Sequence, residues 1–533
     1  MHAWLASGLR RFYPASPAEH GQSLDIAAAR GERCAVQAVC RTDNAQRIIH
    51  AAVHAPEPLL VVLRRVGYVS MPHVTTETPL DDIEGGDYLP GFVPDPLLPE
   101  DTVHAGPRET NAFWITIHIP PDARPGNYQI GITLAADGEQ LPPLMVNLTV
   151  HHAALGPRRD FPVTHWFYAD ALCDWYHVEL YQDAFWPVVE PYFANLVAHG
   201  QDTIYVPLWT PPLDGVKRPT QLLGVSHDAG TYHFDWSLVR RWVHAAQSLG
   251  LTSFEWPHLF TQWGAAHPPR IYAGHGETAT LLWPPDSGAT SPVYRSFLSQ
   301  FLPAFERFLR AENLLDHSFF HLSDEPHGDA HLASYRAARV MLWELAPWMQ
   351  VMDALTDIDF ARAELTDIPI PLLTTAPAFV DAGFPAWAYF CCVPRGRYLN
   401  RFLDTPLAKI RMAGWLFYRN RARGFLHWGY NYWYKRQTTE LIDPYRVTDA
   451  FGWPGWSYGD PFVVYPGSSG PVDSMRWEVF AESLQDYALI QHAGMHPDDP
   501  MLADIQDYAT FPRDPAWIAE RRRWALAQLD RQC

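Results

Sequence analysis

The first third of the chain alternates apolar and polar residues with a period of two. The clearest example is the run from Trp114 to Ile119, in which isoleucines occupy every second position. Alternation of this kind is typical of strands that bury one face. Asp137-Gly138 separates two such runs and indicates a hairpin turn. We therefore predict an antiparallel β-sandwich over residues 1–157, ending near a Gly-Pro-Arg-Arg turn.

From residue 158 the pattern changes to short apolar runs separated by amphipathic segments. Apolar residues in these segments recur three and four positions apart, as in Phe297, Phe301, Phe305 and Phe308, which indicates helices. The predicted strands are 161–167, 203–207, 252–258, 318–323, 350–355, 387–393, 424–429 and 462–465. The predicted helices between them are 184–199, 237–249, 293–311, 331–345, 406–421 and 475–491. The alternation predicts a (β/α)8 TIM-type barrel over 158–495, followed by a helical tail over 496–533.

The fourth predicted strand ends in two adjacent acids and a proline, Asp324-Glu325-Pro326. Proline cannot continue a strand ladder, so the acids lie at the carboxyl end of the strand, where barrel enzymes place their active sites. Neighbouring strand residues point to opposite faces, so both acids can enter one site only if the backbone turns there. The alternative is that Asp324 is the N-cap of the following helix.

Other polar and aromatic residues follow the ends of the predicted strands. These candidate binding residues are His165, Asp170, Glu255, His258, Gln262, Trp263, Tyr389, Tyr398, Trp428, Asn431 and Trp433. Sugar hydroxyls need hydrogen-bonding partners and sugar rings need flat apolar faces, so this set favours a carbohydrate site. Structural alternatives stay open: Glu255 and His258 could bond to each other, Tyr398 could pack a loop, and the tryptophans could fill the core.

Composition narrows the classes of partner. A formal net charge of −19 argues against nucleic acid or an anionic membrane, and no apolar run is long enough to span a bilayer. The six cysteines form no zinc-binding spacing and no disulfide framework, and the adjacent Cys391 and Cys392 are poorly placed to pair. With no secretory signal and no phosphate or dinucleotide loop, we expect a cytoplasmic protein without metal or cofactor. A homo-oligomer is possible.

Several strings resemble family 123 glycoside hydrolases and their relatives in the domain-of-unknown-function 4091 group. They are His258 to Ala265, Ser323 to Pro326, Gly424 to Trp428 with Asn431 and Trp433, Tyr465 to Gly467, and Arg476 to Glu478. The resemblance covers the predicted barrel and implies a retaining exo-β-N-acetylhexosaminidase of the N-acetylgalactosaminidase type. It further implies that Glu325 is the general acid and base, and that Asp324 holds the substrate's 2-acetamido group while that group attacks the anomeric carbon.

The residues fit this substrate-assisted division. Catalytic pairs that straddle a sugar ring are about 5–5.5 Å apart in ordinary retaining enzymes and about 6.5–9.5 Å apart in inverting ones. Sequence neighbours suit neither arrangement, and the end of the predicted 424–429 strand carries no acid. Two alternatives remain. One is a glycosidase for sugars without an acetamido group, with Glu255 as the separate carboxylate; the other is a non-catalytic sugar-binding relative.

Overall fold

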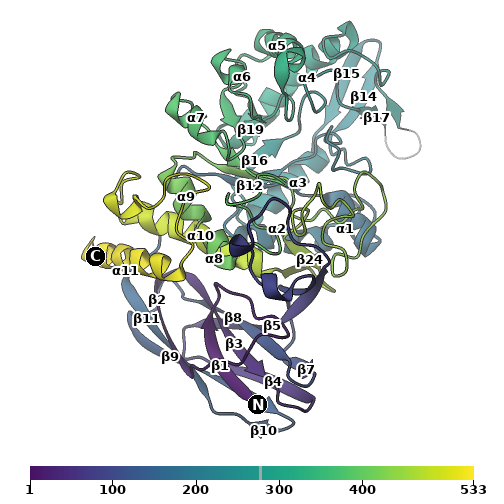
Figure 1. The fold of residues 1–533 in the computed structure, drawn as a ribbon. Coiled ribbons are helices and arrows are strands. Elements are labelled where there is room, and N and C mark those ends of the chain that lie inside the picture. Colours follow the sequence, from purple (N-terminus) through teal and green to yellow (C-terminus); the bar gives the residue numbers. More distant parts are fainter. Residues whose placement is uncertain (275–278, 533) are drawn as a thin grey trace.

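The computed structural model describes residues 1–274 and 279–532. Residues 2–154 form two stacked β-sheets, drawn in purple and blue in Figure 1. The first sheet has the order β1 (His2–Ser7), β3 (Arg33–Arg41), β8 (Thr110–His118), β5 (Leu60–Met71) and β6 (Gly91–Leu98). The second has the order β2 (Ser23–Arg30), β11 (Leu144–Ala154), β9 (Gly126–Ala136), β4 (Arg47–His54) and β7 (Thr102–Ala105), with β10 (Glu139–Gln140) on β9. Neighbouring strands are antiparallel except for β11 and β2.

The predicted alternation is confirmed in β8. Phe113, Ile115 and Ile117 point into the core between the two sheets, whereas Trp114 points the other way and joins the core of the remaining chain. Both faces of β8 are therefore buried, because the α/β part of the molecule covers the outer face. The turn at Asp137 and Gly138 is also confirmed, and both residues have the positive φ that a tight hairpin requires.

The α/β part is built on parallel strands. Six of them form one sheet in the order β19 (Ser318–Phe320), β16 (Ser253–Trp256), β13 (Thr203–Tyr205), β12 (Val163–His165), β23 (Phe425–His427) and β22 (Ala388–Tyr389). A separate parallel pair comprises β20 (Met352–Ala354) and β21 (Ile368–Ile370). Single parallel bridges join this pair to the two ends of the sheet, Phe320 to Val351 and Leu372 to Tyr389. Seven of the eight predicted strands thus belong to this parallel set, six in the sheet and one, β20, in the separate pair.

Two of the strand predictions need correction. Residues 368–370 form β21, which we did not predict, because Pro369 and Pro371 argue against a strand that must donate backbone hydrogen bonds. The predicted strand 462–465 is not a member of the parallel set. Instead β24 (Val464–Pro466) pairs antiparallel with β25 (Pro471–Asp473). An apolar run shows that a segment is buried, but not which partner it pairs with.

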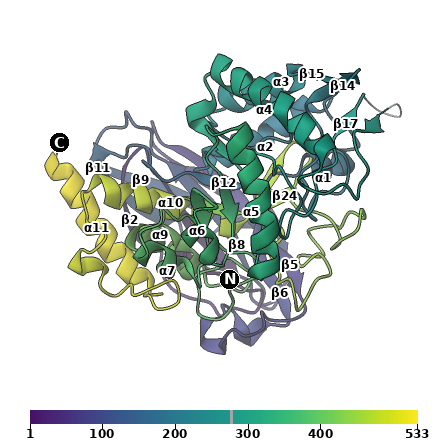
Figure 2. The same ribbon diagram turned by 90° about the horizontal axis from the view of Figure 1, so that it is seen from above.

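Helices alternate with the parallel strands and surround them (Figure 2). They are α1 (Ala169–Tyr176), α2 (Trp186–Ala198), α3 (Ser237–Ser248), α4 (Pro292–Ala311), α5 (Gly328–Leu345), α6 (Asp359–Arg362), α7 (Ala376–Asp381), α8 (Leu407–Arg411), α9 (Ala413–Arg419), α10 (Met475–His492) and α11 (Pro515–Gln532). Short elements comprise the hairpins β14 (Gly224–Asp228) with β15 (Thr231–Asp235) and β17 (Tyr272–Ala273) with β18 (Thr280–Leu281), and the 3-10 turns Leu80–Asp82, Gly86–Tyr88, Leu315–His317 and Pro500–Leu502. The predicted helix 406–421 is divided into α8 and α9. None of the helices in the described part of the chain is long and apolar enough to cross a bilayer.

The two parts meet through a buried ion-pair cluster. Arg33 and Arg64 of the first sheet both bond to Glu478 at the start of α10, each at 2.7 Å. Arg64 also pairs with Asp473 of β25. At the other end of the interface, α11 lies beside β11 in both views, and Asp530 accepts a hydrogen bond from His151 (Figures 1 and 2). The predicted helical tail is therefore docked, while the domain boundaries at 157 and 495 stay predictions.

Candidate active site

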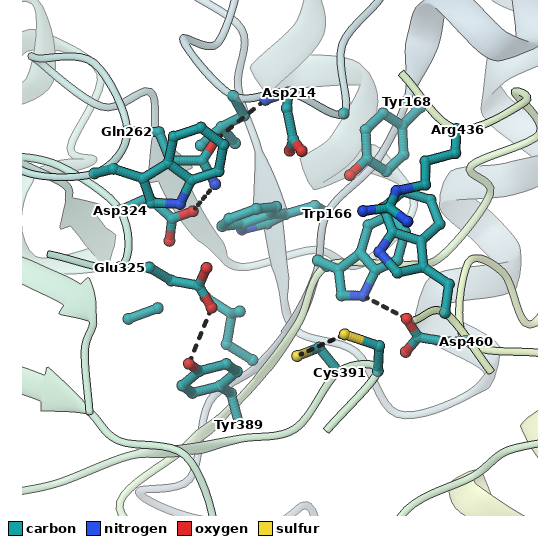
Figure 3. Close-up of a pocket in the computed structure, with 18 of the residues that line it drawn as sticks. Trp166, Tyr168, Asp214, Gln262, Asp324, Glu325, Tyr389, Cys391, Arg436 and Asp460 are labelled. Carbon is teal, nitrogen blue, oxygen red and sulfur yellow. Dashed lines mark hydrogen bonds between the residues drawn. The ribbon is translucent and has the colours of Figure 1, made fainter. Parts of the chain in front are cut away.

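A cavity of about 260 Å³ opens at the carboxyl ends of the parallel strands. Six of the candidate residues line it: Gln262, Trp263, Asp324, Glu325, Tyr389 and Trp428. Figure 3 shows Asp324, Glu325 and Tyr389 on one side and Asp460 and Arg436 on the other. The cavity therefore joins residues from distant parts of the chain.

The two adjacent acids enter the cavity because the backbone turns sharply after β19. Glu325 has a φ of 46°, in the left-handed region that non-glycine residues seldom adopt. Its N–H donates to the carbonyl of Ala354, at the end of the neighbouring β20, at 2.9 Å. The following helix, α5, begins at Gly328 with His327 as its N-cap. The N-cap alternative for Asp324 is therefore wrong, and the strained turn marks a functional position.

Asp353 of β20 holds this turn from beneath. Its carboxylate accepts hydrogen bonds from the backbone N–H groups of Leu322 and Ser323, at 3.0 and 3.2 Å, and from Tyr335 Oη. It also bonds to His321 Nδ1 at 3.2 Å. Four hydrogen bonds thus hold one buried carboxylate, and through it the loop that carries the two acids.

His321 connects Asp353 to a second buried acid, Glu255, whose Oε1 lies 2.7 Å from His321 Nε2. Burial opposes the charged imidazole, but the hydrogen bonds to Asp353 and Glu255 raise the pKa of His321 to about 9. The ring is therefore protonated near neutrality. His258, His321 and Asp353 lie close enough together to share a metal ion, which would have to displace the imidazole proton of His321.

Burial governs the charge of the two acids. It raises the pKa of Asp324, and the neighbouring Glu325 raises it further. Burial also raises the pKa of Glu325, although a hydrogen bond from Tyr389 Oη to Oε1, at 3.1 Å, opposes it. Gln262 Nε2 donates to Asp324 Oδ2 at 2.8 Å (Figure 3). Like charges this close titrate as a pair, so the pair keeps one proton to a higher pH than separate carboxyls would.

Trp263 is held over the cavity by a strained backbone segment. Trp263, Gly264 and Ala265 all have left-handed φ values of 59°, 102° and 55°. The Trp263 N–H donates to the Asp324 carbonyl at 2.8 Å, and the Ala265 N–H donates to Ser323 Oγ at 3.2 Å. A Cβ at position 264 would lie 2.6 Å from the His331 ring, so glycine is required there. The segment and the acid-bearing turn form one unit that leaves the tryptophan about half exposed.

The opposite wall contains residues that sequence reasoning missed. Trp428 Nε1 donates to Asp460 Oδ2 at 3.2 Å, and burial raises the pKa of Asp460. Arg436, Cys391 and Cys392 also line the cavity and were not predicted. Trp166 and Asp214 line it as well; they follow the ends of the first two predicted strands but were left out of the candidate set. Arg436 and Asp460 lie in irregular segments that carry no periodic signal.

Seven of the candidate residues do not line this cavity, and their role in ligand binding stays a prediction. They are His165, Asp170, Glu255, His258, Tyr398, Asn431 and Trp433. Glu255 is fully buried and accepts hydrogen bonds from Thr164 Oγ1, at 2.6 Å, and Trp166 Nε1, at 2.8 Å. It therefore positions Trp166, which does line the cavity. The alternative in which Glu255 bonds to His258 is not seen in the described structure, where Glu255 bonds to His321 instead.

The remaining residues of this group hold the loops around the cavity. Asp170 accepts from the Lys217 N–H at 2.8 Å, and Asn431 bonds to both the N–H and the carbonyl of Tyr168. Trp433 donates to the Val464 carbonyl. His165 lies in the core beside His427, with ring centroids 5.6 Å apart. A position near the end of a strand selects such residues because it does not distinguish the last residue of the strand from the buried residues one step before it.

Comparisons with known proteins agree with this geometry. The family model described as "Glycoside hydrolase 123, catalytic domain" matches residues 166–493. The fold is similar to that of a family 123 glycoside hydrolase from Clostridium perfringens that was studied for glycolipid glycan hydrolysis, at a TM-score of 0.75 and 14% identity, covering 99% of this chain and 98% of that chain. A family 5 xyloglucanase from Bacteroides ovatus has a TM-score of 0.33 at 11% identity, covering 90% of this chain and 99% of that chain. This similarity is too low to support an inference about the protein.

A search of curated proteins found no significant match. The family model spans more than half of the chain and includes the acid pair and both walls of the cavity. The protein is therefore a glycosidase that belongs to glycoside hydrolase family 123.

Proposed function

We propose that this protein is a retaining exo-β-N-acetylhexosaminidase, of the N-acetylgalactosaminidase type, that uses substrate-assisted catalysis. The observation that carries the proposal is the placement of Asp324 and Glu325 side by side on one wall of a single cavity. Acids on the same wall cannot flank a sugar ring from opposite sides, as a conventional pair does. They can serve one face of a substrate that supplies its own nucleophile.

In this proposal Glu325 protonates the glycosidic oxygen and then activates water. Burial raises the pKa of Glu325, in the direction that a general acid requires. Asp324, held by Gln262, accepts a hydrogen bond from the acetamido N–H while the acetamido oxygen attacks the anomeric carbon. The bond from the anomeric carbon to the leaving oxygen breaks, and an oxazolinium ion forms. Water activated by Glu325 then opens that ring, so the configuration is retained.

We further propose that the parallel strands close into a (β/α)8 barrel. The parallel bridges at Val351 and Leu372 support closure, because they join the pair β20–β21 to both ends of the six-stranded sheet. A second cavity of about 560 Å³ shares Asp214, Gln262 and Trp263 with the first. We propose that it receives the leaving group, with the half-exposed Trp263 ring between the two sugars.

Asp460 supports a second candidate function. It lies across the cavity from Glu325 in Figure 3, and its Oδ1 is buried without a hydrogen-bond partner in the described structure. A carboxylate in that position could act as the nucleophile of a retaining glycosidase for sugars that lack an acetamido group. Burial raises the pKa of Asp460, which disfavours the ionised nucleophile that this alternative needs.

A substrate panel with matched variants separates the two. Aryl β-N-acetylgalactosaminide, β-N-acetylglucosaminide and plain β- and α-glycosides are assayed with the wild type, Asp324→Asn and Asp460→Asn. We expect turnover of a 2-acetamido sugar, a loss of kcat of about 100-fold or more in Asp324→Asn, and a smaller loss in Asp460→Asn. Activity only on sugars without the acetamido group, lost in Asp460→Asn, would replace the proposal with the alternative. Ligand-induced thermal stabilisation without turnover of any substrate would indicate a sugar-binding relative.

A further inference from the structure

Two adjacent cysteines form part of the cavity wall and have no role in the proposed reaction. Cys391 and Cys392 follow β22, are partly exposed, and line the same cavity as Glu325. Their Sγ atoms lie 3.9 Å apart (Figure 3). Arg395 Nε donates to the Cys392 carbonyl and Asn400 Nδ2 to the Cys391 carbonyl, each at 3.0 Å. Both peptide units are therefore held, and the two thiols are presented together.

The distance between the sulfur atoms fits shared metal coordination better than a disulfide. Consecutive Cα atoms are about 3.8 Å apart, which is shorter than the usual span across a disulfide, about 4.4–6.8 Å. A disulfide between neighbours is therefore strained. Two thiolates bound to one tetrahedral ion, with metal–sulfur bonds of about 2.3 Å, lie about 3.8 Å from each other. The 3.9 Å separation of Cys391 and Cys392 needs almost no adjustment to reach that geometry.

We propose that Cys391 and Cys392 form a two-thiolate binding site for a soft divalent metal ion on the wall of the active-site cavity. On binding, the ion forms two metal–sulfur bonds and displaces the thiol protons to solvent, with no change of oxidation state. Water completes the coordination.

The bound ion occupies space that the sugar needs, so binding inhibits the enzyme. This consequence rests on the proposed function, whereas metal binding itself does not. Thiophilic metal ions that bind to the two cysteines would therefore control the activity.

The direct test is a titration of the full chain with Cd²⁺, followed by the ultraviolet charge-transfer absorbance of cadmium–thiolate bonds, without substrate. We expect one strongly bound ion, at least about tenfold weaker binding in Cys391→Ser or Cys392→Ser, and no band in the double variant. Cys34→Ser, which changes a partly exposed cysteine of β3, is the matched control and should bind as the wild type does. Zn²⁺ should compete with Cd²⁺. A wild type without the band, or a double variant that keeps it, would overturn the proposal.

A second probe tests whether both thiols react together. Phenylarsine oxide bridges two thiols by forming two arsenic–sulfur bonds, and its oxo oxygen leaves with the two thiol protons as water. Intact-mass spectrometry should show one adduct on the wild type and on Cys34→Ser, and none on either single variant at Cys391 or Cys392. Melting curves verify that the variants are folded, and Cys392→Ala replaces Cys392→Ser if needed. An adduct that persists in the single variants would place the reactive thiols elsewhere and contradict the proposal.

Discussion

Two buried carboxylates of the molecule have opposite environments. At the interface between the sandwich and the α/β part, Glu478 is buried, yet Arg33 and Arg64 hold its pKa well below the usual range. In the cavity, Asp324 is also buried, and burial together with the neighbouring Glu325 carboxylate raises its pKa. The interface acid is stabilised in its charged form, whereas the environment of Asp324 favours its protonated form.

The difference shows how one chain separates stability from chemistry. An ion pair that is buried and complete is costly to break, because each partner left behind keeps an uncompensated charge. An acid that is buried without a cation weakens the fold slightly but gains a proton that it can donate near neutrality. Four substitutions test this contrast.

The largest expected effect is on turnover by Glu325→Gln. The amide keeps the shape of the side chain and its hydrogen bond with Tyr389, but it cannot deliver a proton, so kcat should fall by about 1,000-fold. Steady-state kinetics on a substrate with a poor leaving group measures the loss. Substrates with very acidic leaving groups need little protonation and should lose much less, and equal losses on both would argue against a general-acid role.

Glu478→Gln should instead lower stability. Arg33 and Arg64 would face a neutral amide in a buried site, and the free energy of unfolding should fall by about 3–5 kcal/mol. Because the pKa of Glu478 is lowered in the fold, its contribution is present above the pKa of the unfolded chain and is lost as the pH falls. Urea melts at pH 4 and pH 7 measure both effects. Glu344→Gln, in an exposed pair with Arg295, is the control and should change stability by less than about 0.5 kcal/mol.

Asp324→Asn should raise the melting temperature, by about 1–3 °C, while it reduces activity. The raised pKa of Asp324 means that its ionised form destabilises the fold as the pH increases above the unfolded value. The gain should therefore appear at neutral pH and vanish in acid. Differential scanning fluorimetry across pH tests it, and a loss of stability at neutral pH would show that the nearby His321 outweighs burial and Glu325.

The smallest expected effect is a shift of the pH profile by Asp214→Asn. Burial is the main cause of the raised pKa of Glu325, and the nearby Asp214 carboxylate adds to it. Removing that charge should move the alkaline limb of kcat/KM to lower pH, because the acid must be protonated to act. A pH series with an uncharged aryl substrate measures the limb. The exposed, distant Asp359→Asn should leave it in place, and an unchanged limb in Asp214→Asn would remove Asp214 from the electrostatics of Glu325.

Much of this architecture was predictable from local pattern. The period-two run at Ile115 predicted the sandwich, and the proline after Glu325 predicted a turn at the end of a strand. The prolines near β21 argued against a strand, because proline disfavours a strand through its own backbone. The pairing with β20, which stabilises β21, depends on a distant segment and is not visible in the local sequence. Glu255 was placed in the site because it lies near the end of a predicted strand, yet a residue one layer below the strand end is fully enclosed. Asp460 lies at the cavity because it contacts Trp428, which is distant in the sequence. The residues next to Asp460 in the sequence do not predict this contact.

The described lining of the cavity includes the carboxyls Asp214, Asp324, Glu325 and Asp460 and a single guanidinium, Arg436. A sulfated or uronic-acid residue placed there would meet repulsion from more than one side, whereas a neutral amino sugar would not. We therefore expect glycans rich in acidic groups to be poor substrates. Selectivity by charge is thus built into the same surface that supplies the proton.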